Sequence, residues 1–135
     1  LARMYWYMVE FGLIMTPHGL RAYGAGMLSS QTETIYSVTD PTPNRVAFEL
    51  ERVMGTDYAI DDFQKTYFVL ESYDQLFDAM NVPLAPIYDR LAKKPAIDPA
   101  TTLPTDRLYH VHGAADSIIS LGEETHRTHR QQRPA

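Results

Sequence analysis

The sequence predicts an α+β fold in which helices dominate and the strands are short and form β-hairpins. Three observations lead to this prediction. The chain starts with an apolar helical stretch, a turn motif follows between two short apolar runs, and a later run is dense in β-branched and aromatic residues. The chain has 135 residues, which is enough for one modest domain with a hydrophobic core.

The first predicted element is a helix that ends near Glu10, with Gly12 as its stop signal. Residues 1–13 are apolar almost all the way round a helical wheel, which is typical of a buried helix. Glu10 is out of place there, because an isolated carboxylate in an apolar site must be protonated, paired or bound to a metal. The residues alone leave open a salt bridge with Arg3 or Arg21, exposure at the helix end, or a metal ligand.

A small hairpin is predicted after this helix. Pro17 and Gly19 occupy the second and fourth positions of a type I turn, which would pair residues 13–15 with residues 20–23. The stretch "GAGMLSSQTE" then begins with two glycines, and glycine lets a backbone come close to a neighbouring group.

Three elements are predicted in the middle of the chain. Residues 45–54 have the apolar spacing of a helix that Gly55 ends. The stretch "TYFVLES" is predicted to be a strand. Residues 73–80 are predicted to form a short helix that Ser72 opens.

The pattern weakens after these elements, so we divide the chain into residues 1–93 and residues 94–135. The second part is a predicted linker and tail, because "KKPAIDPATTLPTD" is polar and rich in proline and the last residues are weakly patterned. The chain does not start with methionine, and it opens on Leu1 inside a predicted helix. We therefore expect a piece of a longer protein.

Composition excludes several functions. The net charge of −5 argues against a nucleic-acid partner, and the lack of cysteine excludes disulfides and thiolate metal sites. No apolar run approaches the roughly 20 residues of a membrane span, and there is no signal peptide, so we expect a cytoplasmic protein. The five histidines show no pair at the four- or five-residue spacing of a helical metal site; they are His18, His110, His112, His126 and His129.

Three stretches closely resemble the bacterial branch of the pterin-dependent aromatic amino acid hydroxylases. They are "YWYMVEFGL", "GLRAYGAGMLSSQTETIYS" and "PNRVAFELERVMGTDYAIDDFQKTYFVLESYDQLFDA", and they occur in the family's order over roughly residues 1–91. The resemblance implies the catalytic-domain fold of that family in incomplete form. It also implies an enzyme that uses iron(II), tetrahydrobiopterin and dioxygen to hydroxylate an aromatic ring.

The resemblance also implies roles for particular residues. Glu10 matches the glutamate ligand of the iron, which the family holds with two histidines and one carboxylate. The substrate-binding positions are matched by Trp6, Phe11, Gly26, Ser29, Ser30, Glu33 and Ile60, and the pterin side by Ala2 and Tyr5. Ser29 would also support an iron-binding histidine. Taken singly, these residues could be ordinary core aromatics, helix-capping hydroxyls and turn glycines.

The departures from the family pattern define what is missing. The upstream H-x-x-x-x-H histidine pair, the arginine and threonine that grip the substrate carboxylate, and most of the pterin loop are absent. The expected partner is therefore the missing N-terminal part of the same catalytic domain, and we expect the isolated fragment to be inactive. The apolar Ile60 favours L-phenylalanine as the substrate. The alternatives are a tryptophan-hydroxylating relative or a truncated, non-enzymatic domain that lacks the two histidines.

Overall fold

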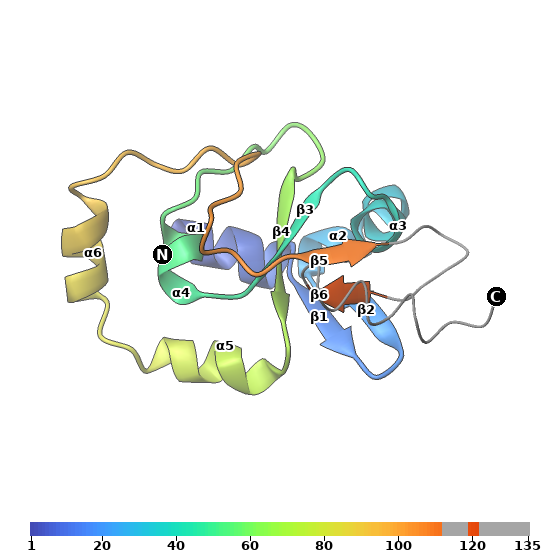
Figure 1. Cartoon of the computed structure of the whole chain (residues 1–135), viewed down its shortest axis with the longest axis horizontal. Coiled ribbons are helices and arrows are strands. Elements are labelled where there is room, and N and C mark those ends of the chain that lie inside the picture. The colour runs from blue at the N-terminus through green and yellow to red at the C-terminus, as the bar shows by residue number, and fades with distance from the viewer. Residues whose placement is uncertain (112–118, 122–135) are drawn as a thin grey trace.

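The computed structural model of the chain describes residues 1–111 and 119–121, and Figure 1 shows their arrangement. The elements, in chain order, are α1 (Ala2–Met4), the π-helix η1 (Tyr5–Glu10), β1 (Leu13–Thr16), β2 (Gly19–Ala22), α2 (Ala25–Leu28), α3 (Gln31–Thr39), β3 (Asn44–Ala47), α4 (Leu50–Met54), β4 (Thr66–Leu70), α5 (Tyr73–Met80), α6 (Ala85–Leu91), β5 (Tyr109–Val111) and β6 (Ile119–Leu121). This mixture of short strands and helices agrees with the predicted α+β class.

A four-stranded sheet with the order β2-β1-β4-β3 organises the fold. The β1 and β2 strands are antiparallel, whereas β4 runs parallel to both of its neighbours. All five residues of β4 are buried, so the strand predicted from "TYFVLES" is confirmed as the centre of the sheet. The β5 and β6 strands form a separate antiparallel pair.

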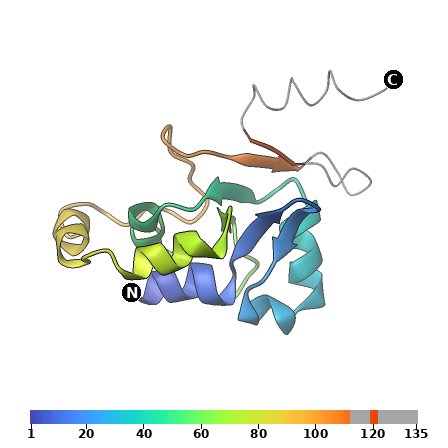
Figure 2. The ribbon, with the colours of Figure 1, turned by 90° about the horizontal axis from the view of Figure 1, so that it is seen from below.

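Alternate residues of β4 point to opposite faces of the sheet, as strand geometry requires. Phe68 and Leu70 face a cluster of buried side chains that includes residues of η1 and α4. Tyr67 and Val69 face a second cluster that includes residues of β1, β2 and α2. Helices therefore cover both faces of the sheet, and Figure 2 shows that α1 and η1 form one continuous helix.

The predicted hairpin is confirmed. Leu13 pairs with Ala22 and Thr16 pairs with Gly19, so the turn consists of the two residues between β1 and β2. Gly19 has a φ of 102°, a conformation that residues with a Cβ rarely adopt. The Thr16 hydroxyl donates a 2.8 Å hydrogen bond to the Gly19 carbonyl oxygen and holds the turn closed.

The first helix ends at Glu10, as predicted, but it is not buried on all sides. Tyr7 and Met8 are fully buried, whereas Tyr5 and Val9 are exposed. The prediction of an entirely buried helix is wrong in this respect, because only one side of η1 lies against the sheet. From Tyr5 onward the helix is a π-helix, in which residues five apart lie on one side.

The helix predicted for residues 45–54 is wrong in its first half. Residues 44–47 form β3, in which Val46 lies opposite Phe68 of β4. Local apolar spacing favoured a helix, but pairing with a strand about 20 residues away along the chain outweighs it. The helical half is α4, which begins after Glu49; the Glu49 carboxylate accepts hydrogen bonds from the first backbone N–H groups of α4.

Residues 95–111 lie along the core at several points. Thr56 forms an isolated bridge with Ile97, and Val46 forms one with Leu108. The division of the chain at residue 93 stays a prediction. In the part of the chain covered by the structure, no helix has the length and apolar character that crossing a membrane would require.

Candidate functional site

The Glu10 carboxylate lies next to Gly26, a residue without a Cβ. Glu10 is the last residue of η1 and is half-buried. A Cβ added to Gly26 would lie 2.8 Å from Glu10 Oε2 and 3.2 Å from Cζ of Phe11. The structure thus brings three predicted site residues together, and the glycine is what allows their close approach.

Neither arginine considered as a salt-bridge partner pairs with Glu10 within residues 1–111. Arg3 donates a 3.0 Å hydrogen bond to the carbonyl oxygen of Met54. Arg21 donates a 2.9 Å hydrogen bond to the carbonyl oxygen of Leu20. The salt-bridge alternative is therefore wrong for these two arginines, which leaves exposure at the helix end or a metal ligand.

The π-helical turn places Tyr5 beside Glu10, five residues further along. A hydrogen bond between the Tyr5 hydroxyl and the Glu10 carboxylate raises the pKa of Tyr5, and the negative charge adds to the effect. Tyr5 and Ala2, the two residues predicted to face a pterin, are both exposed on the α1–η1 helix.

An aromatic wall, formed by Trp6, Phe11 and Tyr58, adjoins Glu10. The ring centroids of Trp6 and Phe11 are 4.9 Å apart, and those of Trp6 and Tyr58 are 4.7 Å apart with an angle of 16° between the planes. The π-helix again explains the first pair, because the backbone N–H of Phe11 donates to the carbonyl oxygen of Trp6. Sequence reasoning did not single out Tyr58, since no local pattern distinguishes it from other loop tyrosines.

A hydrogen-bonded network lies behind the aromatic wall. Glu33 is buried, and its Oε2 accepts a 2.8 Å hydrogen bond from the Tyr67 hydroxyl and a 3.0 Å bond from the Gln64 backbone N–H. Gln64 Oε1 accepts a 3.0 Å hydrogen bond from Trp6 Nε1. Hydrogen bonding to Glu33 adds to the effect of burial in raising the pKa of the Tyr67 hydroxyl. Sequence reasoning had named Glu33 but neither Tyr67 nor Gln64 as a functional residue.

The two predicted serines have different settings. The Ser30 hydroxyl accepts a 3.3 Å hydrogen bond from the Glu33 backbone N–H and so caps α3, which is the capping role considered from the sequence. Ser29 is exposed, and its hydroxyl donates a 2.9 Å bond to the carbonyl oxygen of Gly26. Ser29 is thereby tied to the residue over which the Glu10 carboxylate lies.

Ile60, the predicted substrate-reading residue, lies on the loop that joins α4 to β4. Its side chain is 75% exposed. The same loop carries Tyr58 and Gln64, so Ile60 is connected through the backbone to the aromatic wall and to the network behind it.

The described residues provide one ligand of a metal site, the carboxylate of Glu10. Among the residues that the structure describes, no group of three or more His, Cys, Asp or Glu side chains could hold a metal ion. His18 lies in the hairpin turn and His110 in β5, while His112, His126 and His129 lie outside the described residues. A half-buried carboxylate without a cationic partner in residues 1–111 suits a divalent ion, provided that further ligands come from elsewhere.

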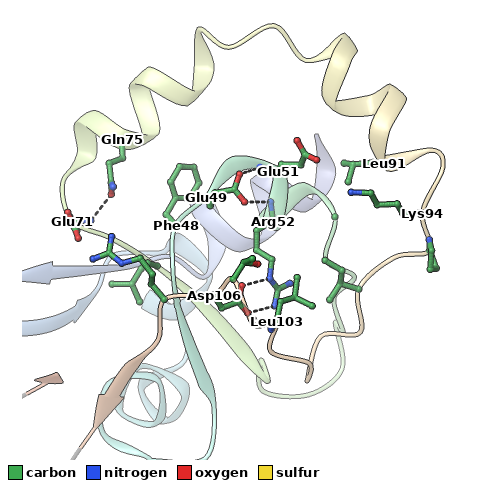
Figure 3. A pocket seen from close by; sticks show the side chains of 17 residues that line it. Phe48, Glu49, Glu51, Arg52, Glu71, Gln75, Leu91, Lys94, Leu103 and Asp106 are labelled. Atoms are coloured by element: carbon green, nitrogen blue, oxygen red, sulfur yellow. Dashed lines mark hydrogen bonds and ion pairs between the residues drawn. The ribbon is translucent and has the colours of Figure 1, made fainter. Parts of the chain in front are cut away.

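A hollow of about 680 Å³ lies away from these residues, between α4, β4 and the segment that follows α6 (Figure 3). No predicted site residue lines it. Arg52 and Asp106, on its wall, form an ion pair with a 2.9 Å distance between Nε and Oδ1. Two of the charged groups in this hollow are thus already paired with each other.

Comparisons with known proteins agree with the predicted resemblance. The family described as biopterin-dependent aromatic amino acid hydroxylase matches residues 1–92. The phenylalanine-4-hydroxylase of Chromobacterium violaceum is 61% identical over 92 residues, which are 68% of this chain and 31% of that protein. The phenylalanine-4-hydroxylase of Caulobacter vibrioides is 54% identical over 106 residues, which are 78% of this chain and 36% of that protein.

Solved structures give the same result for the fold. Phenylalanine hydroxylase from Chromobacterium violaceum bound to cobalt superposes with a TM-score of 0.78 at 53% sequence identity, over 79% of this chain and 39% of that chain. The predicted fold class, an incomplete aromatic amino acid hydroxylase catalytic domain, is confirmed. The chain spans about a third of the length of these curated relatives.

Proposed function

Since the chain belongs to the biopterin-dependent aromatic amino acid hydroxylases, we propose that it is the C-terminal part of a phenylalanine 4-monooxygenase. The intact enzyme would convert L-phenylalanine to L-tyrosine with dioxygen, iron(II) and tetrahydrobiopterin. The missing N-terminal part would supply the remaining iron ligands, and a cytoplasmic location is part of the proposal.

One observation carries this proposal. Within residues 1–111, the Glu10 carboxylate forms no ion pair, and it lies against Gly26, where a Cβ would be 2.8 Å from its Oε2 and would displace the carboxylate. A half-buried carboxylate that forms no ion pair within residues 1–111 is poorly explained by stability, because a charge that is partly withdrawn from water needs a partner. A metal ion completed by ligands from the missing part provides that partner.

The described residues suit this chemistry. Glu10 would be the carboxylate ligand of the iron, and the bound iron and pterin would supply the activation of oxygen. Trp6 and Phe11 would hold the substrate's aromatic ring by apolar and edge-to-face contacts. Ser29, Ser30 and Glu33 would shape the polar end of the pocket behind Gly26.

Two further assignments complete the proposal. Ala2 and Tyr5 would lie on the pterin side, where both are exposed. Ile60 would favour phenylalanine, because an apolar pocket edge gives a phenol no hydrogen-bonding partner. Hydroxylation of tryptophan is the alternative, and competition between the two amino acids in one assay separates them.

The proposal is tested in a chimera, in which residues 1–92 of this chain replace the matching 92 residues of the Chromobacterium violaceum enzyme. We expect pterin-dependent tyrosine formation from the chimera. Glu10→Gln should abolish iron binding and most activity while keeping the fold, since glutamine has nearly the same shape but lacks the charge. Glu51→Gln, at an exposed surface pair, is the matched control and should retain both.

Iron content and melting temperature are measured on the same preparations. Full iron occupancy with a collapsed melting temperature in Glu10→Gln would contradict the proposal and would make Glu10 a structural residue. The isolated 135-residue chain should neither bind iron(II) tightly nor form tyrosine, because one carboxylate is a poor metal site. Robust turnover by the isolated chain would also contradict the proposal.

A further inference from the structure

Gln64 joins three separate parts of the candidate site through its own polar groups. Gln64 is buried, with only 2% of its surface exposed. Its Oε1 accepts from Trp6 Nε1, and its Nε2 donates to the carbonyl oxygen of Ala59, each at 3.0 Å. Its backbone N–H donates to Glu33 Oε2, also at 3.0 Å. The residue therefore connects η1, the loop before β4, and α3.

We propose that Gln64 is a positioning residue for the aromatic pocket. Its carboxamide holds the Trp6 indole in the aromatic wall and at the same time closes the loop that carries Ile60. The inference rests on the proposed function in one respect, namely that Trp6 contacts the substrate. The positioning of Trp6 by Gln64 is a separate physical statement and can be tested without any activity.

The chemistry of the partners defines the orientation of the carboxamide. An indole N–H can only donate, so it must face the oxygen of the side chain. A backbone carbonyl can only accept, so the carbonyl of Ala59 must face the nitrogen. Both requirements are met by one orientation of the amide, and a flipped amide would break both bonds together.

Other side chains could not make both of these hydrogen bonds at this position. Glutamate has no donor for the Ala59 carbonyl, and it would bring a second buried carboxylate close to Glu33. Asparagine is one methylene shorter. Methionine has a similar length and packs well, but it would leave the indole N–H of the half-buried Trp6 without this partner, which is unfavourable.

The orientation of Trp6 matters because of what it touches. Its indole is stacked on Tyr58 and lies 4.9 Å from the ring of Phe11, the residue directly after Glu10. A rotated indole would therefore change the wall next to the proposed metal ligand. We expect substrate binding to suffer while iron binding, which depends on Glu10, does not.

The first experiment uses the fluorescence of the 135-residue chain, in which Trp6 is the only tryptophan. Gln64→Met should shift the emission maximum and raise the acrylamide quenching constant about threefold, because loss of the hydrogen bond releases the indole from one orientation. The matched control is Gln75→Met on α5, which removes a hydrogen bond from the Glu71 backbone N–H on another part of the fold. The control should leave emission and quenching unchanged.

A folded Gln64→Met chain with unchanged emission and quenching would overturn the proposal. If the variant does not fold, exchange of the Trp6 indole N–H in the unmodified chain decides. Strong protection from exchange is expected for a proton bonded to a buried carboxamide, and exchange as fast as in a free peptide would overturn the proposal.

The second experiment separates this inference from the proposed function. In the chimera, Gln64→Met should raise KM for phenylalanine about fivefold with iron content unchanged, whereas Glu10→Gln loses the iron. An inactive chimera would count against the proposed function, and the fluorescence of the chain would still test the role of Gln64. An unchanged KM in an active chimera would overturn the link between Trp6 positioning and substrate binding.

Discussion

Two regions of the molecule differ in whether a buried or half-buried charge has an ion-pair partner. Arg52 and Asp106 form an ion pair in which the side chains are 4% and 3% exposed. The remaining guanidinium nitrogens of Arg52 donate to the Thr56 hydroxyl and to the Thr101 carbonyl oxygen. Glu10, by contrast, forms no ion pair within residues 1–111, although it is half-buried.

The contrast separates groups that stabilise the fold from a group that is available for chemistry. A buried guanidinium whose three nitrogens all donate hydrogen bonds is part of the structure, and removal of its partner is costly. A carboxylate that lies over a glycine and forms no ion pair within residues 1–111 adds little to stability, so we assign Glu10 to the proposed iron site. Functional sites are where a fold accepts such unmet interactions.

The largest effect is expected at the paired region. Asp106→Ala should lower the free energy of unfolding by about 3–5 kcal/mol, because Arg52 would remain buried without its counter-charge. Urea unfolding monitored by circular dichroism measures the change. The double variant Asp106→Leu with Arg52→Met should recover much of the loss, since both charges are then removed from the interior.

The exposed pair of Glu51 and Arg90 serves as the control for this prediction. Its Oε1 to Nη2 distance is 2.6 Å, yet the arginine side chain is 52% exposed. Glu51→Ala should change stability within the error of the measurement, because water screens an exposed pair. A loss at Glu51 as large as that at Asp106 would remove the distinction between buried and exposed pairs in this chain.

An intermediate effect is expected at the two glycines beside Glu10. A Cβ on Gly24 would lie 2.2 Å from the backbone oxygen of Glu10, so Gly24→Ala must shift the backbone and should cost about 1–3 kcal/mol. A Cβ on Gly26 would come closest to the end of the Glu10 side chain, which can rotate away, and it would lie 3.1 Å from the Glu10 backbone oxygen, a milder contact than that of Gly24. Gly26→Ala should therefore cost less stability in the chain but displace the carboxylate, and thermal unfolding of both variants measures the difference. Equal costs would mean that the Glu10 side chain is held as rigidly as its backbone.

The smallest effect is expected in the pKa values of two tyrosines of η1, the exposed Tyr5 beside Glu10 and the buried Tyr7. Burial raises the pKa of Tyr7, whereas the Glu10 carboxylate raises the pKa of Tyr5. Glu10→Gln should therefore lower the pKa of Tyr5 toward its ordinary value of about 10 and leave that of Tyr7 raised. NMR titration of the tyrosine ring carbons distinguishes the two residues, and an unchanged Tyr5 pKa would show that its hydroxyl does not contact Glu10.

The raised pKa of Tyr7 predicts how the stability of the fold depends on pH. A raised pKa means that folded Tyr7 keeps its proton at a pH where the unfolded chain has lost it. The stabilising contribution is therefore complete below pH 10 and is lost as the pH rises above 10, by about 1.4 kcal/mol per pH unit for one such tyrosine. Urea unfolding at pH 9 and pH 11 measures the loss, and Tyr7→Phe should reduce it. A stability that rises over this range would contradict the assignment.

Elements with a strong local signal were predicted correctly. The hairpin turn and the β4 strand depend on residues next to one another in the chain: a proline and a glycine in the turn, and a β-branched and aromatic run. The α5 helix has the predicted bounds and Ser72 is its N-cap residue, but the Ser72 side chain makes no capping hydrogen bond. The helix predicted over residues 45–54 is wrong in its first half, which pairs with β4, because a distant partner leaves no mark on local spacing.

The candidate site also has parts that the sequence predicted and parts that only the folded structure revealed. The sequence by itself determined the family, through three stretches in a recognisable order, and it identified Glu10 as a carboxylate in an unusual setting. Only the tertiary structure decided that Glu10 pairs with neither Arg3 nor Arg21, that Tyr58 and Gln64 join Trp6, and that Asp106 is the partner of Arg52. The physical reason is range: turn and strand preferences act between neighbours in sequence, whereas ion pairs, ring stacking and buried hydrogen bonds form between residues that only the folded chain brings within a few ångströms.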